Sequence, residues 1–225
     1  MSEIVKLYDK IYSHYRLMNS LMTLGLDKYW RRKTVEYIRL LNSNPLSICD
    51  ICCGTGDFTE FLVSKFPGAV VTGVDANENM IKIAEEKNIK ANFLNSYISN
   101  LPFDNESFDL VTVSFATRNI FFASDFDKSL NEIKRVLKKG GFFVSVETSM
   151  PANFLFKFLI KIYLETVLTA IKIFLPGSYK SYSFLKSSIY SFKAEKFNEK
   201  LSLHFDAVYM KNLFPGSVAI CAAKK

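Results

Sequence analysis

Residue types that define several classes of protein are scarce in this sequence. Its 225 residues include four cysteines and two histidines. Cys49 and Cys52 form a Cys-x-x-Cys pair, but a structural zinc site needs a second pair of ligands, and His14 and His204 are badly spaced to provide one. Because free cysteines are commonly small core residues, we interpret the thiols as reduced and buried in a cytoplasmic protein, and we expect no metal site.

The sequence also lacks an apolar N-terminal stretch, internal repeats and long basic runs. The first ten residues carry charges throughout and contain no apolar stretch, which argues against a signal peptide. There is no internal repeat and no low-complexity segment. The net charge of +7 is compatible with an anionic partner, either nucleic acid or a membrane face, and also with an ordinary solvated surface. The basic residues are scattered, with short clusters at 31–33 and 138–139, so we expect no nucleic-acid partner.

Apolar and aromatic side chains are what the sequence has in abundance. Hydrophobic residues make up 49% of the chain and aromatic residues 15%, with 21 phenylalanines. This composition predicts a well-packed core, and the length predicts a single domain, 1–225. Within that domain we expect N-terminal helices over 1–42 and a helical cap over 150–200. We also expect some of the phenylalanines to line an apolar ligand site.

Strand-like and helix-like segments alternate through the middle of the chain. The predicted strands are 46–49, 70–75, 91–95, 108–115 and 142–147, followed by an antiparallel edge hairpin of 207–211 and 217–221. The predicted helices are 1–25, 27–41, 58–63, 77–86 and 125–137. Asp27 is the expected N-cap of the second, and Gly25 and Gly140 should end the first and the last. This alternation is typical of an α/β fold, here a doubly wound, mostly parallel Rossmann-like sheet.

The segment 50–57, Asp-Ile-Cys-Cys-Gly-Thr-Gly-Asp, joins the first predicted strand to a helix. Gly54 and Gly56 lack a Cβ, so the backbone can approach a nucleotide-like ligand where amide N–H groups are free at a helix start. A glycine turn also joins strands and helices in proteins that bind nothing there. Asp75 ends the next strand, where a carboxylate accepts hydrogen bonds from ribose hydroxyls.

Two residues at this turn distinguish between the two candidate cofactors, a dinucleotide and S-adenosylmethionine. A dinucleotide fingerprint needs a third glycine where this sequence has Thr59, and Asp57 would repel a pyrophosphate at the helix start. S-adenosylmethionine (SAM) has no phosphate, and its sulfonium and ammonium groups are cationic, so Asp50 and Asp57 suit it. Asp57 would also serve as an ordinary N-terminal helix carboxylate. The charges favour SAM.

Three separated motifs resemble the signatures of one enzyme family. Segment 15–22, Tyr-Arg-Leu-Met-Asn-Ser-Leu-Met, followed by 25–30, is similar to its N-terminal signature. Segment 114–119, Ser-Phe-Ala-Thr-Arg-Asn, matches a Ser-Phe-x-x-Arg-Asn motif, and 135–141, continuing to 147–149, matches a second signature. The resemblance covers nearly the whole chain and points to the ubiquinone/menaquinone biosynthesis C-methyltransferases, which are class I SAM-dependent methyltransferases.

The resemblance implies C-methylation of a demethylated, isoprenoid-tailed quinol, such as demethylmenaquinol, with SAM as methyl donor. It implies cofactor contacts at Thr55, Asp75, Ser114 and the pair Tyr97 and Ile98, where the adenine edge is read. Together with the glycine turn, the predicted cofactor-binding residues are Asp50, Gly54, Thr55, Gly56, Asp75, Ala76, Tyr97, Ile98 and Ser114. The chain departs from the family at Arg16 for Asp, Asp27 for His, and Tyr97 for the common Asp or Asn. It also has Tyr-Ser-Phe-Leu at 182–185 where the family has Tyr-Arg-Tyr-Leu, which removes one hydroxyl.

Methyl transfer to a ring carbon needs a hydroquinone that loses a phenolic proton and is held in line with the sulfonium methyl. Positioning, exclusion of water and a polar group beside the phenolate then supply most of the acceleration. Arg118 and Asn119 follow the carboxyl end of a strand, where such sites form. We hypothesise that Arg118 stabilises the phenolate, Asn119 orients the ring, and Tyr15 handles the proton. The alternative for Arg118 is a structural ion pair with a nearby carboxylate.

Segment 154–175 predicts one long and largely apolar helix. Its charges, Lys157, Lys161, Glu165 and Lys172, fall within a narrow stripe. Lys161 and Glu165 argue against a membrane-spanning helix, because both would lie near the middle of the bilayer. Two alternatives remain for the wide apolar face. One is burial in a cap; the other is a peripheral contact with the inner membrane face that gives an apolar quinol a path to the site.

Other functions stay open from the sequence. They are methylation of another apolar or lipid small molecule, non-catalytic binding of SAM, and a nicotinamide oxidoreductase, which Thr59 and Asp57 disfavour. Methylation of a nucleobase amino group is disfavoured because 114–119 is not an Asn-Pro-Pro-Tyr type of loop. The oligomeric state is left open.

Overall fold

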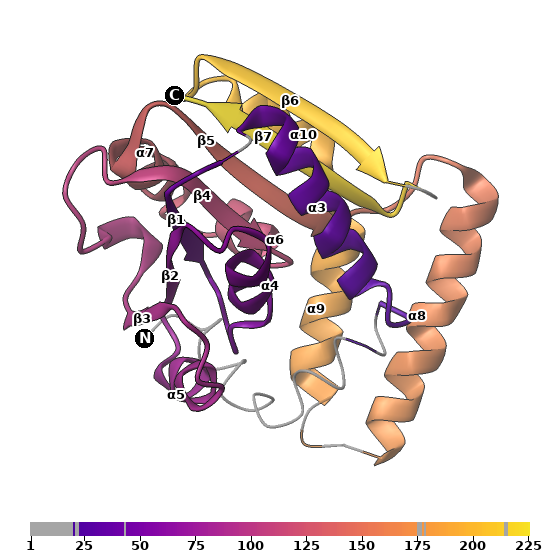
Figure 1. Ribbon diagram of the computed structural model, residues 1–225. Coiled ribbons are helices and arrows are strands. Elements are labelled where there is room, and N and C mark those ends of the chain that lie inside the picture. The colour runs from indigo at the N-terminus through magenta and orange to yellow at the C-terminus, as the bar shows by residue number, and fades with distance from the viewer. Residues whose placement is uncertain (1–19, 21–22, 43, 175–176, 178, 214–215) are drawn as a thin grey trace.

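A seven-stranded sheet forms the centre of the molecule (Figure 1). The computed structural model describes residues 20, 23–42, 44–174, 177, 179–213 and 216–225. The strand order is β3-β2-β1-β4-β5-β7-β6. The strands are β1 (Ser47–Ile51), β2 (Val70–Asp75), β3 (Asn92–Asn95), β4 (Phe108–Ser114), β5 (Leu137–Thr148), β6 (Ala207–Leu213) and β7 (Val218–Lys224). The predicted α/β fold class is confirmed.

The first five strands are parallel and the last two are antiparallel to their neighbours. The chain moves from β1 outward to β2 and β3, and then returns to place β4 and β5 on the other side of β1. The reversal of strand order lies between β1 and β4. In open parallel sheets, ligands bind outside the carboxyl ends of the strands at this reversal. The fold thus places a binding crevice next to the glycine turn that follows β1.

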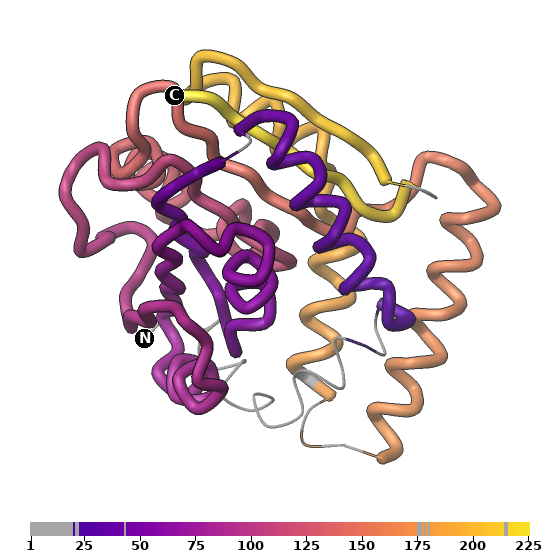
Figure 2. Tube along the Cα trace, viewed as in Figure 1, coloured from indigo at the N-terminus to yellow at the C-terminus, as the bar shows by residue number. Residues whose placement is uncertain are grey.

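Helices cover both faces of the sheet. The helices among the described residues are α3 (Asp27–Leu41), α4 (Asp57–Lys65), α5 (Glu78–Glu86), the 3₁₀ helix η2 (Ile98–Asn100), α6 (Thr117–Phe121), α7 (Phe126–Val136), α8 (Phe154–Phe174), α9 (Tyr179–Ser191) and α10 (Ala194–Leu201). Figure 2 shows α3 running alongside the C-terminal strands, and Lys211 of β6 lies over the ring of Tyr37.

The core has one layer on each side of the sheet. On one side, α7 buries apolar side chains such as Ile133 against the middle of the sheet, and α10 buries Phe197 beside β6 and β7. On the other side, α3 and α4 bury Ile38 and Leu62. These side chains recur at helical spacing, so burial of one apolar stripe per helix explains why the segments fold as helices on the sheet. The two layers hold the strand ends around the crevice in fixed positions.

Helix α8 lies beside the sheet layers and packs mainly on α9 (Figure 1). Leu168 and Ile171 of α8 meet Tyr182 and Leu185 of α9 in a small apolar core of their own. Among the described residues, no helix is long and apolar enough to cross a membrane.

Several boundaries differ from those expected. The N-cap of α3 is Leu26, while Asp27 is the first helical residue and forms an ion pair with Arg31. The stretch 137–141 does not end the preceding helix. It opens β5 instead, with Gly140 at a φ of 77° within the strand. The helix predicted for 1–25 lies almost wholly outside the described residues.

Candidate active site

The glycine turn between β1 and α4 forms one wall of the crevice. Gly54 and Gly56 have φ values of 56° and 76°, a left-handed conformation that favours glycine. A Cβ on Gly56 would come within 3.1 Å of Ala84, so this glycine permits close packing inside the protein. A Cβ on Gly54 would meet no atom within 4 Å. Gly54 therefore faces open space, which lets a ligand approach the backbone.

Asp75, at the end of β2, is held by this turn. Its carboxylate accepts hydrogen bonds from the backbone N–H groups of Gly54 and Asn77, each at 2.8 Å. Burial raises the pKa of the Asp75 carboxyl above its usual value, and the backbone donors oppose that rise. The side chain is thus fixed in orientation beside the crevice, as a carboxylate that binds ribose hydroxyls must be.

Asp50, the last polar residue of β1, is completely buried. Its two carboxylate oxygens accept hydrogen bonds from Thr59 at 2.7 Å and Thr112 at 2.9 Å. Burial raises the pKa of Asp50 to about 6, although both hydrogen bonds and the nearby Arg31 lower it. A cationic ligand would stabilise the ionised form of this carboxylate. Asp57 is different, because its carboxylate forms an ion pair with Lys87.

A cavity of about 340 Å³ opens between the ends of β2 and β4. This volume is within the range of small-molecule sites. Its lining residues come from the glycine turn, the segments after β2 and β3, α6 and the start of α7; they include Cys52, Gly54, Asp75, Ala76, Asn77, Met80, Tyr97, Ile98, Ala116, Asn119, Ile120 and Asp125. The structure therefore brings together the predicted residues Gly54, Asp75, Ala76, Tyr97 and Ile98.

A smaller cavity of about 30 Å³ continues from the same turn toward β4. It is lined by the predicted residues Asp50, Gly54, Thr55 and Ser114, and also by Arg31, Cys52, Cys53, Asp57, Phe58 and Phe115. Cys52 and Gly54 line both cavities. The two cavities thus lie next to each other at the glycine turn.

Two strained residues flank this junction. Cys52 and Phe115 have φ values of 51° and 58°, an uncommon conformation for residues other than glycine. Such strain persists where the surrounding structure enforces it, commonly at ligand sites. Burial raises the pKa of the Cys52 thiol well above its usual value. The thiol is therefore neutral and unreactive, and it forms an apolar wall.

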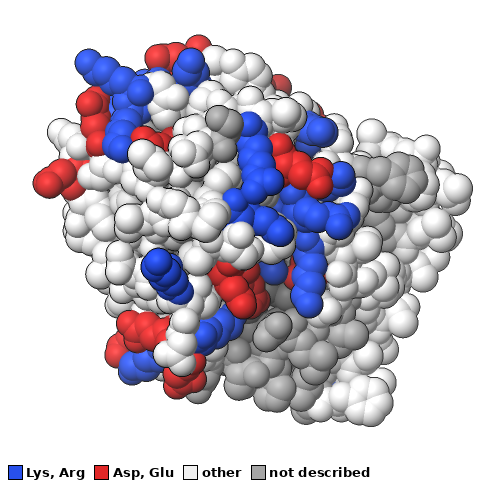
Figure 3. Space-filling view, in the orientation of Figure 1, with Lys and Arg blue, Asp and Glu red and all other residues white. Residues whose placement is uncertain are grey.

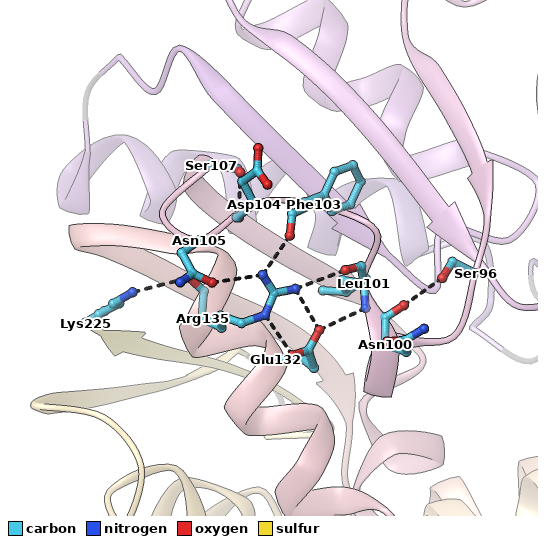
Figure 4. Close-up of polar contacts among 10 residues, drawn as sticks. All are labelled: Ser96, Asn100, Leu101, Phe103, Asp104, Asn105, Ser107, Glu132, Arg135 and Lys225. Atoms are coloured by element: carbon cyan, nitrogen blue, oxygen red, sulfur yellow. Dashed lines mark hydrogen bonds and ion pairs between the residues drawn. The ribbon is translucent and has the colours of Figure 1, made fainter.

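Arg135 of α7 holds the loop that follows Tyr97 and Ile98 (Figure 4). Its guanidinium donates to the backbone oxygens of Leu101 and Phe103 at 3.0 and 2.7 Å, and it pairs with Glu132. Glu132 in turn accepts from the N–H of Leu101 at 3.0 Å. The hydrogen bond from Arg135 keeps the pKa of Glu132 below its usual value. This network explains the role of the arginine at the start of segment 135–141, which holds the loop after Tyr97 and Ile98 without lining the cavity itself.

The predicted catalytic residues are placed differently from one another. Asn119 lines the larger cavity. Arg118 lies outside the lining of both cavities. Its buried guanidinium pairs with Glu147 and donates to Thr148 and, at 3.2 Å, to Ser188 of α9. This geometry favours the structural ion-pair alternative for Arg118. Tyr15 lies outside the described residues.

The cysteines are all free thiols. Among the described residues, no group of three or more histidine, cysteine or acidic side chains could hold a metal ion. Cys49 and Cys221 are core residues, and burial raises the pKa of Cys221 to about 12. The prediction of small buried thiols holds for these two. For Cys52 and Cys53 it was incomplete, because both are only partly buried, Cys52 lines both cavities and Cys53 lines the smaller one.

The site fits SAM in shape and charge. A fixed carboxylate stands beside the larger cavity, a buried carboxylate beside the smaller one, and Gly54, which faces open space, borders both. A model of the ubiE/COQ5 methyltransferase family matches residues 2–225. The chain belongs to the ubiE/COQ5 methyltransferase family. It is a SAM-dependent methyltransferase.

Curated relatives of this methyltransferase have closely similar lengths. The chain is 35% identical to a demethylmenaquinone methyltransferase of Thermotoga maritima over 189 residues, which is 84% of this chain and 80% of the relative. It is 34% identical to a demethylmenaquinone methyltransferase of Bacillus subtilis over 223 residues, covering 94% and 92% of the two chains.

Solved structures with lower identity share the fold. The plantazolicin methyltransferase BpumL, in complex with a monoazolic desmethylPZN analog and SAH, is 18% identical, with a TM-score of 0.68 over 96% of this chain and 89% of that chain. The [4+2]-cyclase SpnF is 14% identical, with a TM-score of 0.62 over 99% and 95%. The fold alone therefore does not determine the reaction.

Sequence reasoning missed several residues of the site. Arg31 and Phe115 line the smaller cavity, and Asn77 and Met80 line the larger one. The segment after the carboxyl end of β2 could have indicated Asn77. Arg31 directly follows the motif segment 25–30, but nothing in the sequence distinguishes it from the neighbouring basic residues Arg32 and Lys33.

Proposed function

We propose that this enzyme methylates a ring carbon of a demethylated, isoprenoid-tailed quinol, such as demethylmenaquinol, in quinone biosynthesis. The observation that carries the proposal is the similarity, at 34–35% identity over most of both chains, to enzymes named demethylmenaquinone methyltransferases. A largely apolar cavity bordered by Ile120, Ala116 and Ala123 supports a site that excludes water from an aromatic acceptor.

The roles of the site residues follow from their positions. SAM supplies an electrophilic methyl group when bound. Asp75 would hold the ribose, and Tyr97 and Ile98 would border the adenine, as both line the larger cavity. Asp50, Thr55 and Ser114 would surround the methionyl end in the smaller cavity. Gly54 allows the ligand to come close to the backbone of the turn, and Gly56, which lines neither cavity, allows the turn to pack against Ala84.

We retain Asn119 and Tyr15 as predicted catalytic residues and assign Arg118 more specifically. Asn119 lines the cavity and would orient the acceptor ring, while Tyr15 would accept or relay the phenolic proton. Arg118 would act by positioning the segment after β4, through Glu147 and Ser188, rather than by touching the phenolate. Arg118→Ala with turnover within a few-fold of wild type and SAM binding intact would exclude the catalytic role of Arg118.

Mass spectrometry tests the reaction itself. The purified enzyme is incubated with SAM and a reduced, prenylated quinol that lacks the ring methyl group. The expected result is a gain of one CH₂ unit on the ring, lost in Asp75→Asn. A parallel incubation with lipid extract separates the alternatives. Methylation of another apolar molecule but not of the quinol would show that the quinol is not the acceptor. SAM binding without any methylated product would indicate a protein that binds SAM without catalysis.

The exposed face of α8 supports a peripheral contact with an anionic membrane face in the cytoplasm. Its buried residues are Leu164, Leu168 and Ile171. Its exposed large apolar residues are Phe154, Leu155, Phe158, Leu159, Ile162, Ile173 and Phe174. The exposure argues against the alternative of a buried cap helix. In Figure 3 the basic side chains gather over α3, and the margin where α8 lies is largely uncharged.

An interfacial α8 would take up quinols whose isoprenoid tails remain in the bilayer. Wide apolar helix faces with flanking lysines bind anionic interfaces, and α8 carries the exposed lysines Lys157, Lys161 and Lys172. Co-sedimentation with phosphatidylglycerol vesicles tests this. Phe158→Glu together with Ile162→Glu should abolish binding, whereas Leu203→Glu, at an exposed leucine away from α8, should not. Absence of wild-type binding would reject the membrane contact and leave the methylation proposal standing.

A further inference from the structure

Arg31 of α3 points inward to the cofactor site. It is buried, and its Nε lies 3.4 Å from the Ser114 hydroxyl at the carboxyl end of β4. Its guanidinium carbon lies 5.7 Å from the centre of the Phe115 ring. Both of these neighbours line the smaller cavity, and so does Arg31. A basic residue from an N-terminal helix is thus built into the wall beside the glycine turn.

The charge of Arg31 is unusual in its surroundings. Of the residues that the structure describes in the lining of the smaller cavity, Arg31 is the one with a positive charge, and Asp50 and Asp57 carry negative charges. Lys87 pairs with Asp57. Asp50 lies close enough to Arg31 for that charge to lower its pKa. The cavity therefore presents the Asp50 carboxylate and the Arg31 guanidinium, which pairs with Asp27 through Nη1, and these two groups complement a ligand carrying both an ammonium and a carboxylate.

The guanidinium has donor capacity that its protein partners leave unused. Nη1 donates to Asp27 at 2.9 Å, and Nε faces Ser114. Within the described part of the chain, these are its hydrogen-bonding partners, and Nη2 donates to none of the described residues. Arginine binds carboxylates through two parallel N–H donors. Asp27 fixes the orientation of the side chain from behind.

We propose that Arg31 binds the α-carboxylate at the methionyl end of SAM. The methionyl end carries one ammonium and one carboxylate. Asp50 suits the ammonium, so the carboxylate needs a donor set on the other side of the same small space, and Arg31 provides it together with the N–H groups at the start of α4. Asp27 acts as the positioning residue for Arg31. Helix α3 is therefore part of the cofactor site and not only a support for the sheet.

Calorimetry with three ligands tests the assignment without requiring turnover. S-adenosylhomocysteine has the carboxylate, its decarboxylated analogue lacks it, and 5′-methylthioadenosine lacks the whole amino-acid end. We expect Arg31→Gln to weaken the binding of S-adenosylhomocysteine about 10- to 100-fold, which is the range for a lost charge-assisted hydrogen bond. The affinities for the other two ligands should change by less than about twofold. Arg32→Gln, on the exposed side of the same helix, is the matched control and should change none of the three.

Two outcomes would overturn the proposal. Equal weakening of all three ligands by Arg31→Gln would show that Arg31 only shapes the site, and unchanged binding of S-adenosylhomocysteine would show that it does not contact the carboxylate. If Arg31→Gln fails to fold, as judged by circular dichroism, Arg31→Lys replaces it. The lysine variant keeps the charge but not the planar fork, so it should lose affinity selectively for S-adenosylhomocysteine, and a uniform loss would contradict the assignment.

Discussion

Replacing Arg118 with methionine removes a buried cation and leaves its partner behind. The side chains of Arg118 and Glu147 are 5% and 2% exposed, so water cannot compensate for the loss. Glu147 keeps hydrogen bonds from the backbone N–H groups of Arg118 at 3.2 Å and Thr148 at 2.7 Å. Breaking a buried ion pair by removing one partner typically costs about 3–5 kcal/mol. Because these donors remain, we expect a loss near the lower end, about 3 kcal/mol.

Urea unfolding followed by circular dichroism measures this loss. The double variant Arg118→Met, Glu147→Gln should regain a large part of the stability, because its carboxamide carries no charge to be left unpaired. Arg118 also donates to Ser188, so the single variant should loosen α9. Lys186→Met is a matched control, because it removes a cation from an ion pair with the exposed Glu165 and should cost less than about 1 kcal/mol. Equal stabilities of wild type and Arg118→Met would refute the reasoning.

Three further predictions concern the cofactor site. Gly54→Ala should weaken SAM binding at least roughly tenfold, because it adds a Cβ at positive φ in the space open to the ligand. Gly68→Ala, in an uncrowded turn, is the control and should leave SAM binding unchanged. Equal effects of the two substitutions would contradict the role of Gly54. Because burial raises the pKa of Asp50 to about 6, the carboxylate gains a proton as the pH falls, and SAM affinity should drop about tenfold between about pH 7 and pH 5. Calorimetry should show proton release on binding near the lower pH, and a pH-independent affinity would exclude an ionised Asp50 as ammonium partner. Arg135→Ala should lower the free energy of unfolding by about 1–3 kcal/mol, through lost hydrogen bonds to two loop carbonyls, and an unchanged urea midpoint would show that the loop does not depend on it.

The sheet could be predicted because each of its strands has a local signature. β1, β2 and β4 are short apolar runs bounded by turn residues, and each is buried along most of its length. The start of β5 could not be predicted in the same way. Lys-Lys-Gly-Gly is typical of a helix end, but Leu137 already pairs with Phe108 across the sheet, through a register shift that depends on the tertiary structure.

Helix α9 shows a second limit of local patterns. Its sequence is rich in serine, and its buried face includes Ser181 and Ser188 as well as Tyr182. A buried serine is tolerated there because Ser188 accepts a hydrogen bond from Arg118. The apolar periodicity that indicates an amphipathic helix is therefore weak, and the buried Ser188 hydroxyl is satisfied by donating to the Leu185 carbonyl at 2.7 Å and by accepting from Arg118.

The candidate site also contains some residues that could be predicted from the sequence and others that could not. Gly54 and Asp75 could be predicted from their positions at or just after the carboxyl ends of parallel strands, which meet at one edge of the sheet, whereas Tyr97 and Ser114 were predicted from the family resemblance. Arg31 could not be predicted, because its contact with Ser114 spans 83 residues and depends on how α3 crosses the sheet. On sequence alone, an arginine in a charged helix is indistinguishable from a solvated one.

Mass analysis of the quinol after incubation with SAM tests the central claim most directly. The enzyme is supplied with SAM and a reduced prenylated quinol lacking its ring methyl, and binding of S-adenosylhomocysteine is verified by calorimetry on the same preparation. We predict the gain of one methyl group on a ring carbon, identified by fragmentation, and its loss in Asp75→Asn. An unchanged quinol in a preparation that binds S-adenosylhomocysteine normally would contradict the proposed function.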